Sequence, residues 1–105
     1  PLDPAAPECP RCGSILKPGV VMFGELLPSD AMLRAEFLCR DAPLLLVVGS
    51  SLQVWPVAGL PNETLSAGGT IAVVNLDETP YDVHAATIVR DASGATLAAV
   101  ARALA

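Results

Sequence analysis

The sequence predicts an α/β fold with a mainly parallel sheet. Two short apolar runs carry this prediction: residues 44–48 read Leu-Leu-Leu-Val-Val, and residues 71–74 read Ile-Ala-Val-Val. Strands that are apolar throughout are typical of parallel sheets, because helices cover both faces of such sheets. A helical pattern precedes the first run and an interrupted one separates the two runs, which is the order that parallel strands need for their connections.

The first helix is predicted to open at residues 28–30 and to end at residues 41–43. Ser29 is the expected N-cap, and Asp30 suits the positive end of the helix dipole. Apolar side chains recur at helical spacing as far as Cys39, which is therefore expected to lie in the core. Pro43 follows shortly afterwards, and helices usually end before such a residue.

The second half of the chain continues this pattern. Residues 53–67 are predicted to form a loop and an interrupted helix, and residues 87–89 a third, short strand. Residues 95–104 are rich in Ala and Leu and predict a closing helix, with Ser93 or Asp91 as its cap. A third strand and a closing helix in this order extend the same α/β arrangement.

Composition excludes several classes of partner. The chain has 105 residues, is 52% hydrophobic and carries a net charge of -5, without a cluster of Lys or Arg, so no nucleic-acid partner is expected. The longest apolar run, residues 44–48, is far shorter than the ~20 residues that span a membrane, and the first residues lack the pattern of a signal peptide. No membrane partner is expected either. Three cysteines with a single C-x-x-C predict a cytoplasmic, metal-binding protein.

Cys9 and Cys12 form a C-x-x-C pair next to Gly13, which predicts a tight turn that offers two thiolates to one cation. A structural zinc ion requires four ligands. Cys39 and His84 are distant in the sequence and belong to no second pair. The pair is therefore interpreted as half of a zinc site, with a redox dithiol or plain structural thiols as the alternatives.

Small and polar residues follow the two apolar strands. Gly49, Ser50 and Ser51 follow the first, and Asn75 and Asp77 follow the second. Ligands of open parallel sheets bind beyond the carboxyl ends of the strands. The hydroxyl and N–H groups of the first set can hold phosphate or ribose oxygens, and the amide and carboxylate of the second can bind ribose hydroxyls. The alternative is that the first set is only a turn and that Asn75 only ends its strand.

Three further residues have roles that the sequence leaves open. Glu25 is either catalytic or accepts backbone N–H groups that fix its loop. His84 has no evident nucleophile or carboxylate partner, so it is expected to be structural. Trp55, the only tryptophan, is expected to pack in the core or to form a lid, in preference to stacking on a ligand.

The order of these motifs resembles the C-terminal half of a sirtuin, the family of NAD-dependent protein-lysine deacylases. The resemblance covers the chain from Cys9 to about Leu104. It rests on four pieces in one order: the C-x-x-C, K-P-G-V-V-M-F-G-E-L-L-P at 17–28, V-G-S-S-L-Q-V-W-P at 48–56, and V-V-N at 73–75.

The resemblance implies two cofactors, NAD and zinc, and a peptide substrate. Cys9 and Cys12 would be the second pair of a four-cysteine zinc ribbon. The residues implied to meet an acylated lysine peptide are Val21, Met22, Phe23, Gly24 and Glu25. The residues implied to bind NAD are Gly49, Ser50, Ser51, Asn75, Asp77 and Ala92. Met22 and Ser50 stand where the family often has Phe and Thr, and both changes are mild.

Other motifs of the family do not occur in this sequence. These are a Gly-Ala-Gly-x-Ser phosphate loop, the general-base His and the first C-x-x-C. No catalytic residue is therefore assigned, and the chain alone is expected to be inactive, with an N-terminal half of the same fold as its partner. The resemblance implies a partial Rossmann-like, NAD-binding domain over residues 29–105, preceded at 1–28 by half a zinc-ribbon knuckle and the substrate-binding segment.

Two alternatives remain at this point. The chain could be a non-catalytic module that binds nucleotide or protein, or two chains could share a zinc ion through Cys9 and Cys12. A fragment of such a sheet is also expected to expose an edge strand and apolar faces, which a partner would cover.

Overall fold

The structure, a computed structural model, describes residues 6–105 as a parallel three-stranded sheet with helices around it, which confirms the predicted α/β class. Its helices are α1 (Ser29–Asp41), α2 (Leu60–Ser66) and α3 (Ser93–Leu104), and its strands are β1 (Leu44–Val48), β2 (Thr70–Val74) and β3 (Thr87–Val89). Two short 3-10 helices, η1 (Val57–Gly59) and η2 (Asp82–His84), lie in the connections. Within this described part, none of the helices is long and apolar enough to cross a membrane.

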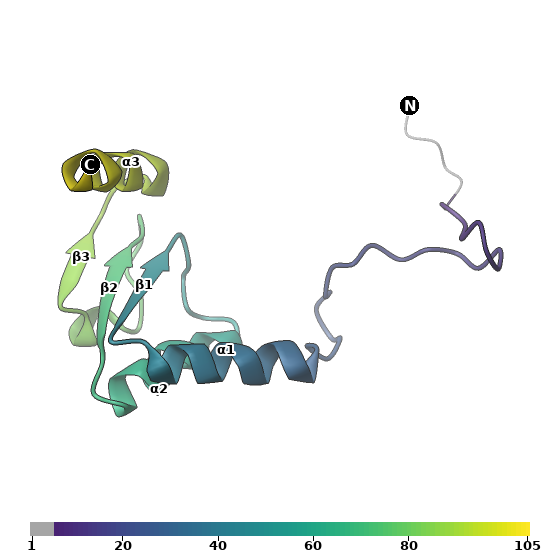
Figure 1. The fold of residues 1–105 in the computed structure, drawn as a ribbon, viewed down its shortest axis with the longest axis horizontal. Coiled ribbons are helices and arrows are strands. Elements are labelled where there is room, and N and C mark those ends of the chain that lie inside the picture. The colour runs from purple at the N-terminus through teal and green to yellow at the C-terminus, as the bar shows by residue number, and fades with distance from the viewer. Residues whose placement is uncertain (1–5) are drawn as a thin grey trace.

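The strands lie in the order β1-β2-β3. Val48 at the end of β1 pairs with Val74 of β2, which in turn pairs with Val89 of β3. The three strands therefore end side by side (Figure 1). Groups that follow the strands in the sequence meet at this one edge of the sheet.

Helices α1 and α2 pack against each other, and α2 packs against β1 and β2 (Figure 1). A buried hydrogen bond joins the two helices, because the hydroxyl of Thr64 donates to the carbonyl oxygen of Cys39 at 2.6 Å. Cys39 is 8% exposed, so the prediction that it lies in the core is confirmed. Gly69 allows the turn after α2 to approach the end of α1, since an added Cβ would lie 2.6 Å from the carbonyl oxygen of Ala42.

The core is small and centred on β2, whereas one face of β1 is uncovered. The central cluster and the side chains packed against it are Val47, Leu52, Val73, Leu45, Tyr81 and Ala85. In contrast, Leu44 and Leu46 of β1 are 58% and 49% exposed. The prediction that both faces of this strand are covered is wrong for this chain, because residues 6–105 supply no layer over these two side chains. The expected exposed edge with apolar side chains is observed instead.

Residues 6–28 contain no helix and no regular strand, only an isolated antiparallel bridge between Glu8 and Ile15. This segment extends away from the sheet and helices (Figure 1). The radius of gyration is accordingly 18.3 Å, against about 13 Å for a compact domain of this size. Residues 20–23 read Val-Val-Met-Phe and are β-prone by residue type, but they form no strand, because no other strand of the described chain bonds to them.

The helix starts differ from the predicted ones. The N-cap of α1 is Pro28, and Ser29 is already the first helical residue without a capping hydrogen bond. Helix α3 starts at Ser93 with Ala92 as its N-cap, and the carboxylate of Asp91 accepts the N–H of Ala92 at 2.7 Å. The predicted caps at both helices are wrong, because the extended backbone that precedes each helix falls on Pro28 and Ala92.

Candidate functional site

The residues that follow the three strands meet at the carboxyl edge of the sheet. Gly49 follows β1, Asn75 follows β2 and Arg90 follows β3. The N–H of Gly49 donates to the carbonyl oxygen of Val74 at 2.9 Å, and the N–H of Asn75 donates to that of Val89 at 3.1 Å. These two bonds continue the hydrogen bonding of the sheet one residue past the ends of β1 and β2. Gly49 and Asn75, both predicted to bind NAD, are therefore neighbours in space.

The turn after β1 brings its backbone to the surface. Gly49 has a φ of +60°, and nothing lies within 4 Å of the place where a Cβ would stand, so a ligand can approach this backbone closely. The hydroxyl oxygen of Ser50 accepts the N–H of Leu52 at 3.3 Å, and Leu52 is buried with a φ of 52°. The buried Leu52 anchors the turn and leaves Gly49 and Ser51 exposed.

The turn after β2 is closed by the side chain of Asn75, whose amide N–H donates to the carbonyl oxygen of Asp77 at 2.9 Å. Asp77 is exposed. Ala92 lies after β3 as the N-cap of α3 and is also exposed. The six residues predicted to bind NAD thus all lie in the segments that follow the carboxyl ends of the strands.

Sequence reasoning missed a polar network behind these turns. The carboxylate of Asp82 accepts the hydroxyl of Thr79 at 2.7 Å and its N–H at 3.2 Å, and it forms an ion pair with Arg90. The hydrogen bond from the Thr79 hydroxyl, and then the Thr79 N–H and the guanidinium of Arg90, hold the pKa of Asp82 below its ordinary value. An Arg directly after a predicted strand was the available signal, but no spacing rule pairs it with an Asp in the preceding turn.

A groove of about 860 Å³ lies between the N-terminal segment, α1 and the loop after β1. The residues predicted to meet the peptide all line it: Val21, Met22, Phe23, Gly24 and Glu25. Its other wall comes from the loop after β1 and includes Trp55, which is 73% exposed. Of the two roles expected for Trp55, packing in the core is therefore wrong, and the role of a lid stays a prediction. Most of the lining is apolar, which suits an aliphatic chain.

Glu25 closes the N-terminal side of this groove with a cluster of local hydrogen bonds. Its carboxylate accepts the N–H of Met22 and the ammonium of Lys17, each at 2.9 Å, and Lys17 also donates to the carbonyl oxygen of Val20 at 2.9 Å. The N–H of Met22, followed by Lys17, lowers the pKa of Glu25 below its ordinary value. Of the two roles that the sequence left open, the structure displays the second: Glu25 fixes its loop by accepting a backbone N–H.

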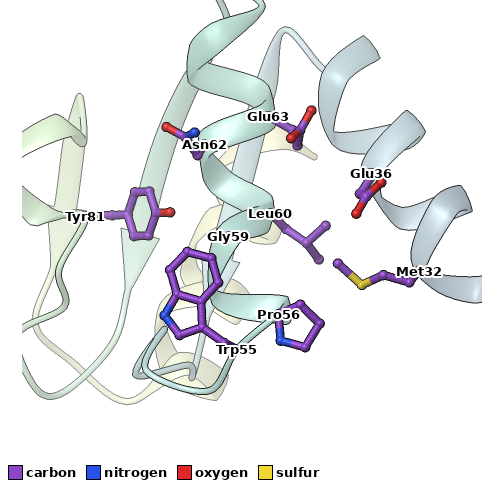
Figure 2. Close-up of a pocket in the computed structure, with 9 residues that line it drawn as sticks. All are labelled: Met32, Glu36, Trp55, Pro56, Gly59, Leu60, Asn62, Glu63 and Tyr81. Carbon is purple, nitrogen blue, oxygen red and sulfur yellow. The ribbon is translucent and has the colours of Figure 1, made fainter. Parts of the chain in front are cut away.

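A smaller cavity of about 270 Å³ adjoins the groove, since Met32, Trp55 and Pro56 line both. Its other lining residues are Glu36, Gly59, Leu60, Asn62, Glu63 and Tyr81 (Figure 2). Figure 2 shows the indole of Trp55 beside Gly59 at the start of α2. An added Cβ at Gly59 would lie 2.8 Å from the indole ring, so this glycine provides the space in which Trp55 rests.

The C-x-x-C pair forms the predicted tight turn. The N–H of Gly13 donates to the carbonyl oxygen of Cys9, and the N–H of Cys9 to that of Ser14, both at 2.8 Å. A hydrogen bond between the Cys12 sulfur and the hydroxyl group of Ser14 lowers the pKa of the Cys12 thiol. No group of three or more His, Cys, Asp or Glu side chains gathers around a metal position in residues 6–105. The turn therefore supplies two possible ligands, and a complete zinc site is not formed by the described residues.

Cys39 and His84 lie apart from these sites. Burial, and then the negative charge of Glu63, raise the pKa of the Cys39 thiol, as expected for a core cysteine. His84 is exposed at the end of η2, before β3, and its N–H donates to the carbonyl oxygen of Tyr81 at 3.0 Å. Neither residue is brought to the C-x-x-C turn or to the groove lining.

The sequence matches the model of the Sir2 family over residues 2–56. The chain belongs to this family. An NAD-dependent protein deacetylase 1 of Pyrobaculum aerophilum is 44% identical over 85 residues, which cover 81% of this chain and 34% of that Sir2 relative. An NAD-dependent protein deacetylase of Thermotoga maritima is 49% identical over 76 residues, which cover 72% of this chain and 31% of the relative.

Solved Sir2 structures have the same fold over the matched part. A structure of Sir2 bound to acetylated peptide is 41% identical, with a TM-score of 0.84 over 90% of this chain and 40% of that chain. A structure of Sir2Tm bound to a propionylated peptide has the same identity and a TM-score of 0.83. The chain spans about a third of the length of the curated Sir2 relatives that it matches, 34% and 31% for the two named above.

Proposed function

We propose that the chain is the C-terminal part of a sirtuin NAD-dependent protein-lysine deacylase, in which it supplies part of the NAD pocket and one wall of the cleft for an acyl-lysine peptide. One loop carries this proposal. Residues 49–57 begin in the Gly49 turn at the sheet edge and include Trp55 in the wall of the groove. A nucleotide at the edge and a peptide in the groove would border the same loop, and a reaction between two ligands requires such proximity.

On the nucleotide side, the proposed ligands are Gly49, Ser50, Ser51, Asn75, Asp77 and Ala92. The open backbone at Gly49 suits phosphate oxygens, and the amide of Asn75 suits ribose hydroxyls. When bound, NAD would supply the ribose carbon that the acyl oxygen attacks. A Sir2 structure with a p53 peptide and NAD+, 41% identical to this chain, supports the pairing of the two ligands.

On the peptide side, the proposed contacts are Val21, Met22, Phe23, Gly24 and Glu25. The bonds of Glu25 to Met22 and Lys17 hold this segment in a defined turn on one side of the groove. An extended peptide can add to exposed backbone of this kind, while an apolar groove accepts its acyl chain. Sir2 relatives solved with acetylated and propionylated peptides support an acyl-lysine occupant.

We expect the general base and two further zinc ligands to come from polypeptide outside these 105 residues. Cys9 and Cys12 offer two thiolates on a tight turn, which fits half of a tetrahedral zinc site. In this proposal residues 1–28 carry the knuckle and the substrate segment, residues 29–105 form the Rossmann-like NAD-binding part, and the protein acts in the cytoplasm.

A chimera tests the proposal directly. The matched third of the Thermotoga maritima relative is replaced by this chain, and nicotinamide release from NAD is measured with an acetyl-lysine peptide. The chimera should release nicotinamide, and the chain alone should not. Turnover by the chain alone would contradict the division of the active site that we propose.

Two pairs of matched variants in the chimera locate the contacts. Asn75→Ala should weaken NAD binding whereas Asn62→Ala, on α2, should not. Phe23→Ala in the groove should weaken peptide binding whereas Phe37→Ala, 66% exposed on α1, should not. Equal effects within either pair would sink the assignment of that site.

The second candidate is a non-catalytic module that binds nucleotide or protein. It is favoured by the position of His84, the only histidine, which is exposed on η2 and outside the groove. The chimera separates the two functions: a folded chimera that binds NAD and peptide but releases no nicotinamide indicates the module. Binding of the peptide is followed by the fluorescence of Trp55, which lines the groove and is the only tryptophan in the chain.

A further inference from the structure

Arg90 ties the ends of two strands together. Arg90 directly follows β3, and Asn75 directly follows β2. The guanidinium of Arg90 donates at 3.3 Å to the carbonyl oxygen of Asn75. The backbone N–H of Asn75 in turn donates to the carbonyl oxygen of Val89 at 3.1 Å. Asn75 is thus held at both its N–H and its carbonyl group, so its backbone cannot rotate without breaking one of these bonds.

The other arm of Arg90 joins a partly buried polar network. It reaches the carboxylate of Asp82, which also accepts the hydroxyl of Thr79 at 2.7 Å. Thr79 is only 8% exposed, and its hydroxyl oxygen accepts the N–H of Tyr81 at 3.3 Å. The ring of Tyr81 packs against the cluster that contains Leu52. Charge-assisted bonds in such a partly buried network are stronger and more rigid than those of a surface ion pair.

This arrangement decides which atom of the Asn75 amide is available. Its nitrogen donates to the carbonyl oxygen of Asp77 at 2.9 Å. A backbone carbonyl can only accept, so the amide nitrogen must face it and the side-chain oxygen must face the other way. No hydrogen bond among residues 6–105 uses that oxygen. A ribose hydroxyl can donate to it.

We propose that Arg90 and Asp82 are positioning residues that hold the turn after β2 so that Asn75 presents its side-chain oxygen, as an acceptor, to a ribose hydroxyl of the nucleotide. The inference rests on the proposed function, because it assumes that the nucleotide occupies this edge. It adds a selection rule: the site prefers a nucleotide with free ribose hydroxyls to one without them.

Calorimetry on the chain with ADP and 2′,3′-dideoxy-ADP tests the rule. The two ligands share the base and the diphosphate and differ only in the ribose hydroxyls. We expect ADP to bind about tenfold more tightly, the size of one good hydrogen bond. Equal affinities for ADP and 2′,3′-dideoxy-ADP would overturn the proposed orientation of Asn75.

Variants separate positioning from general stability. Arg90→Ala should lower the affinity for ADP to that for dideoxy-ADP and leave dideoxy-ADP unchanged. Asn75→Ala should do the same, and the double variant should lose no more than either single one. Arg34→Ala, an exposed Arg on α1, is the matched control and should change nothing. A loss of equal size for both ligands with Arg90→Ala would show a merely structural role and overturn the proposal.

Two further outcomes are distinguishable. If Arg90→Ala does not fold by circular dichroism, Arg90→Lys decides, because it keeps the charge but not the two-armed geometry, and it should lose most of the discrimination. If the unmodified chain binds none of ADP, dideoxy-ADP and NAD, the nucleotide site of the proposed function fails and the inference fails with it. If it binds ADP and dideoxy-ADP equally, only the inference fails.

Discussion

The body of the molecule, residues 29–105, and the N-terminal segment, residues 6–28, are held together by different forces. The body has a buried core, with Ile71 and Val73 both 0% exposed. No residue of the segment is buried, and its order comes from local polar contacts such as those of Glu25 with Met22 and Lys17. Apolar burial stabilises a fold strongly, whereas exposed ion pairs contribute little.

This difference bears directly on the proposed site. The nucleotide edge belongs to the body, where the register of three strands brings its turns together. The peptide side of the groove belongs to the segment, where Phe23 is 93% and Leu26 95% exposed. We therefore expect the nucleotide edge to be formed in the chain alone, and the peptide wall to become ordered only when further polypeptide or substrate covers it.

The largest expected effect comes from removing a buried side chain of the body. Ile71→Ala should lower the free energy of unfolding by about 2–5 kcal/mol, because it loses buried apolar area and leaves a cavity in β2. Leu26→Ala in the segment should change it by no more than about 0.5 kcal/mol. Urea unfolding followed by circular dichroism measures both. Similar losses would show that the segment is part of the cooperative core.

A smaller effect is expected from removing the hydrogen bond between α1 and α2. Thr64→Val should cost about 0.5–1.5 kcal/mol, because it keeps the shape of the side chain but removes its bond to the carbonyl oxygen of Cys39, which retains only the 3.4 Å bond from the N–H of Ala42. Thr70→Val, at an exposed position of β2, is the matched control and should stay close to the unmodified chain. Equal stabilities of the two variants by urea unfolding would contradict this reading of the helix contact.

Acid should destabilise the body through Asp82. Its pKa is lower in the folded chain, so its stabilising contribution is present above the ordinary value of about 3.9 and is lost as the pH falls through the folded value. Asp82→Asn should therefore flatten the fall in unfolding midpoint between about pH 5 and pH 2. Glu25→Gln, in the segment, should leave this fall unchanged although the pKa of Glu25 is also lowered. If Glu25→Gln flattened the fall in unfolding midpoint more than Asp82→Asn, the assignment of the acid sensitivity to the body would be refuted.

The smallest effect is local. Glu25→Gln removes the charge that draws Lys17 and weakens the bond to the N–H of Met22, so that this amide should exchange with solvent several-fold faster. Glu78→Gln, in the loop after β2, is the control. Hydrogen exchange by NMR detects the change, and the unfolding midpoint at neutral pH should not move. Unchanged exchange at Met22 would mean that Glu25 does not hold the loop.

Much of the body followed from local sequence patterns. The predicted strand at 87–89 agrees with β3, and the helix predicted to open at residues 28–30 and to end at residues 41–43 agrees with α1. These elements were predictable because apolar runs and helical periodicity reflect the surroundings of each side chain directly. The caps were not predictable. The extended backbone before each helix falls on Pro28 and Ala92, and neither residue has a side chain of the capping type.

The two sides of the groove were harder to predict. Residues 20–23 are β-prone by type, but a strand exists only where another strand bonds to it, and the described residues offer none. Trp55 was expected in the core or in a lid, and the core position fails because the side chain lies in the wall of the groove, 73% exposed. In both cases the deciding factor is a neighbour that lies far away in the sequence or outside this chain.

The order of the elements, the chemistry of Gly49 and Asn75 after their strands, and the C-x-x-C turn are all readable along the chain, because each depends on residues close together in sequence. The meeting of Asn75 with Arg90, and of Val21 with Trp55 across the groove, is not. These two arrangements depend on the parallel register of three strands and on the path of the loop after β1. Register and loop path are set by packing between distant residues, so the site emerges only in the folded chain.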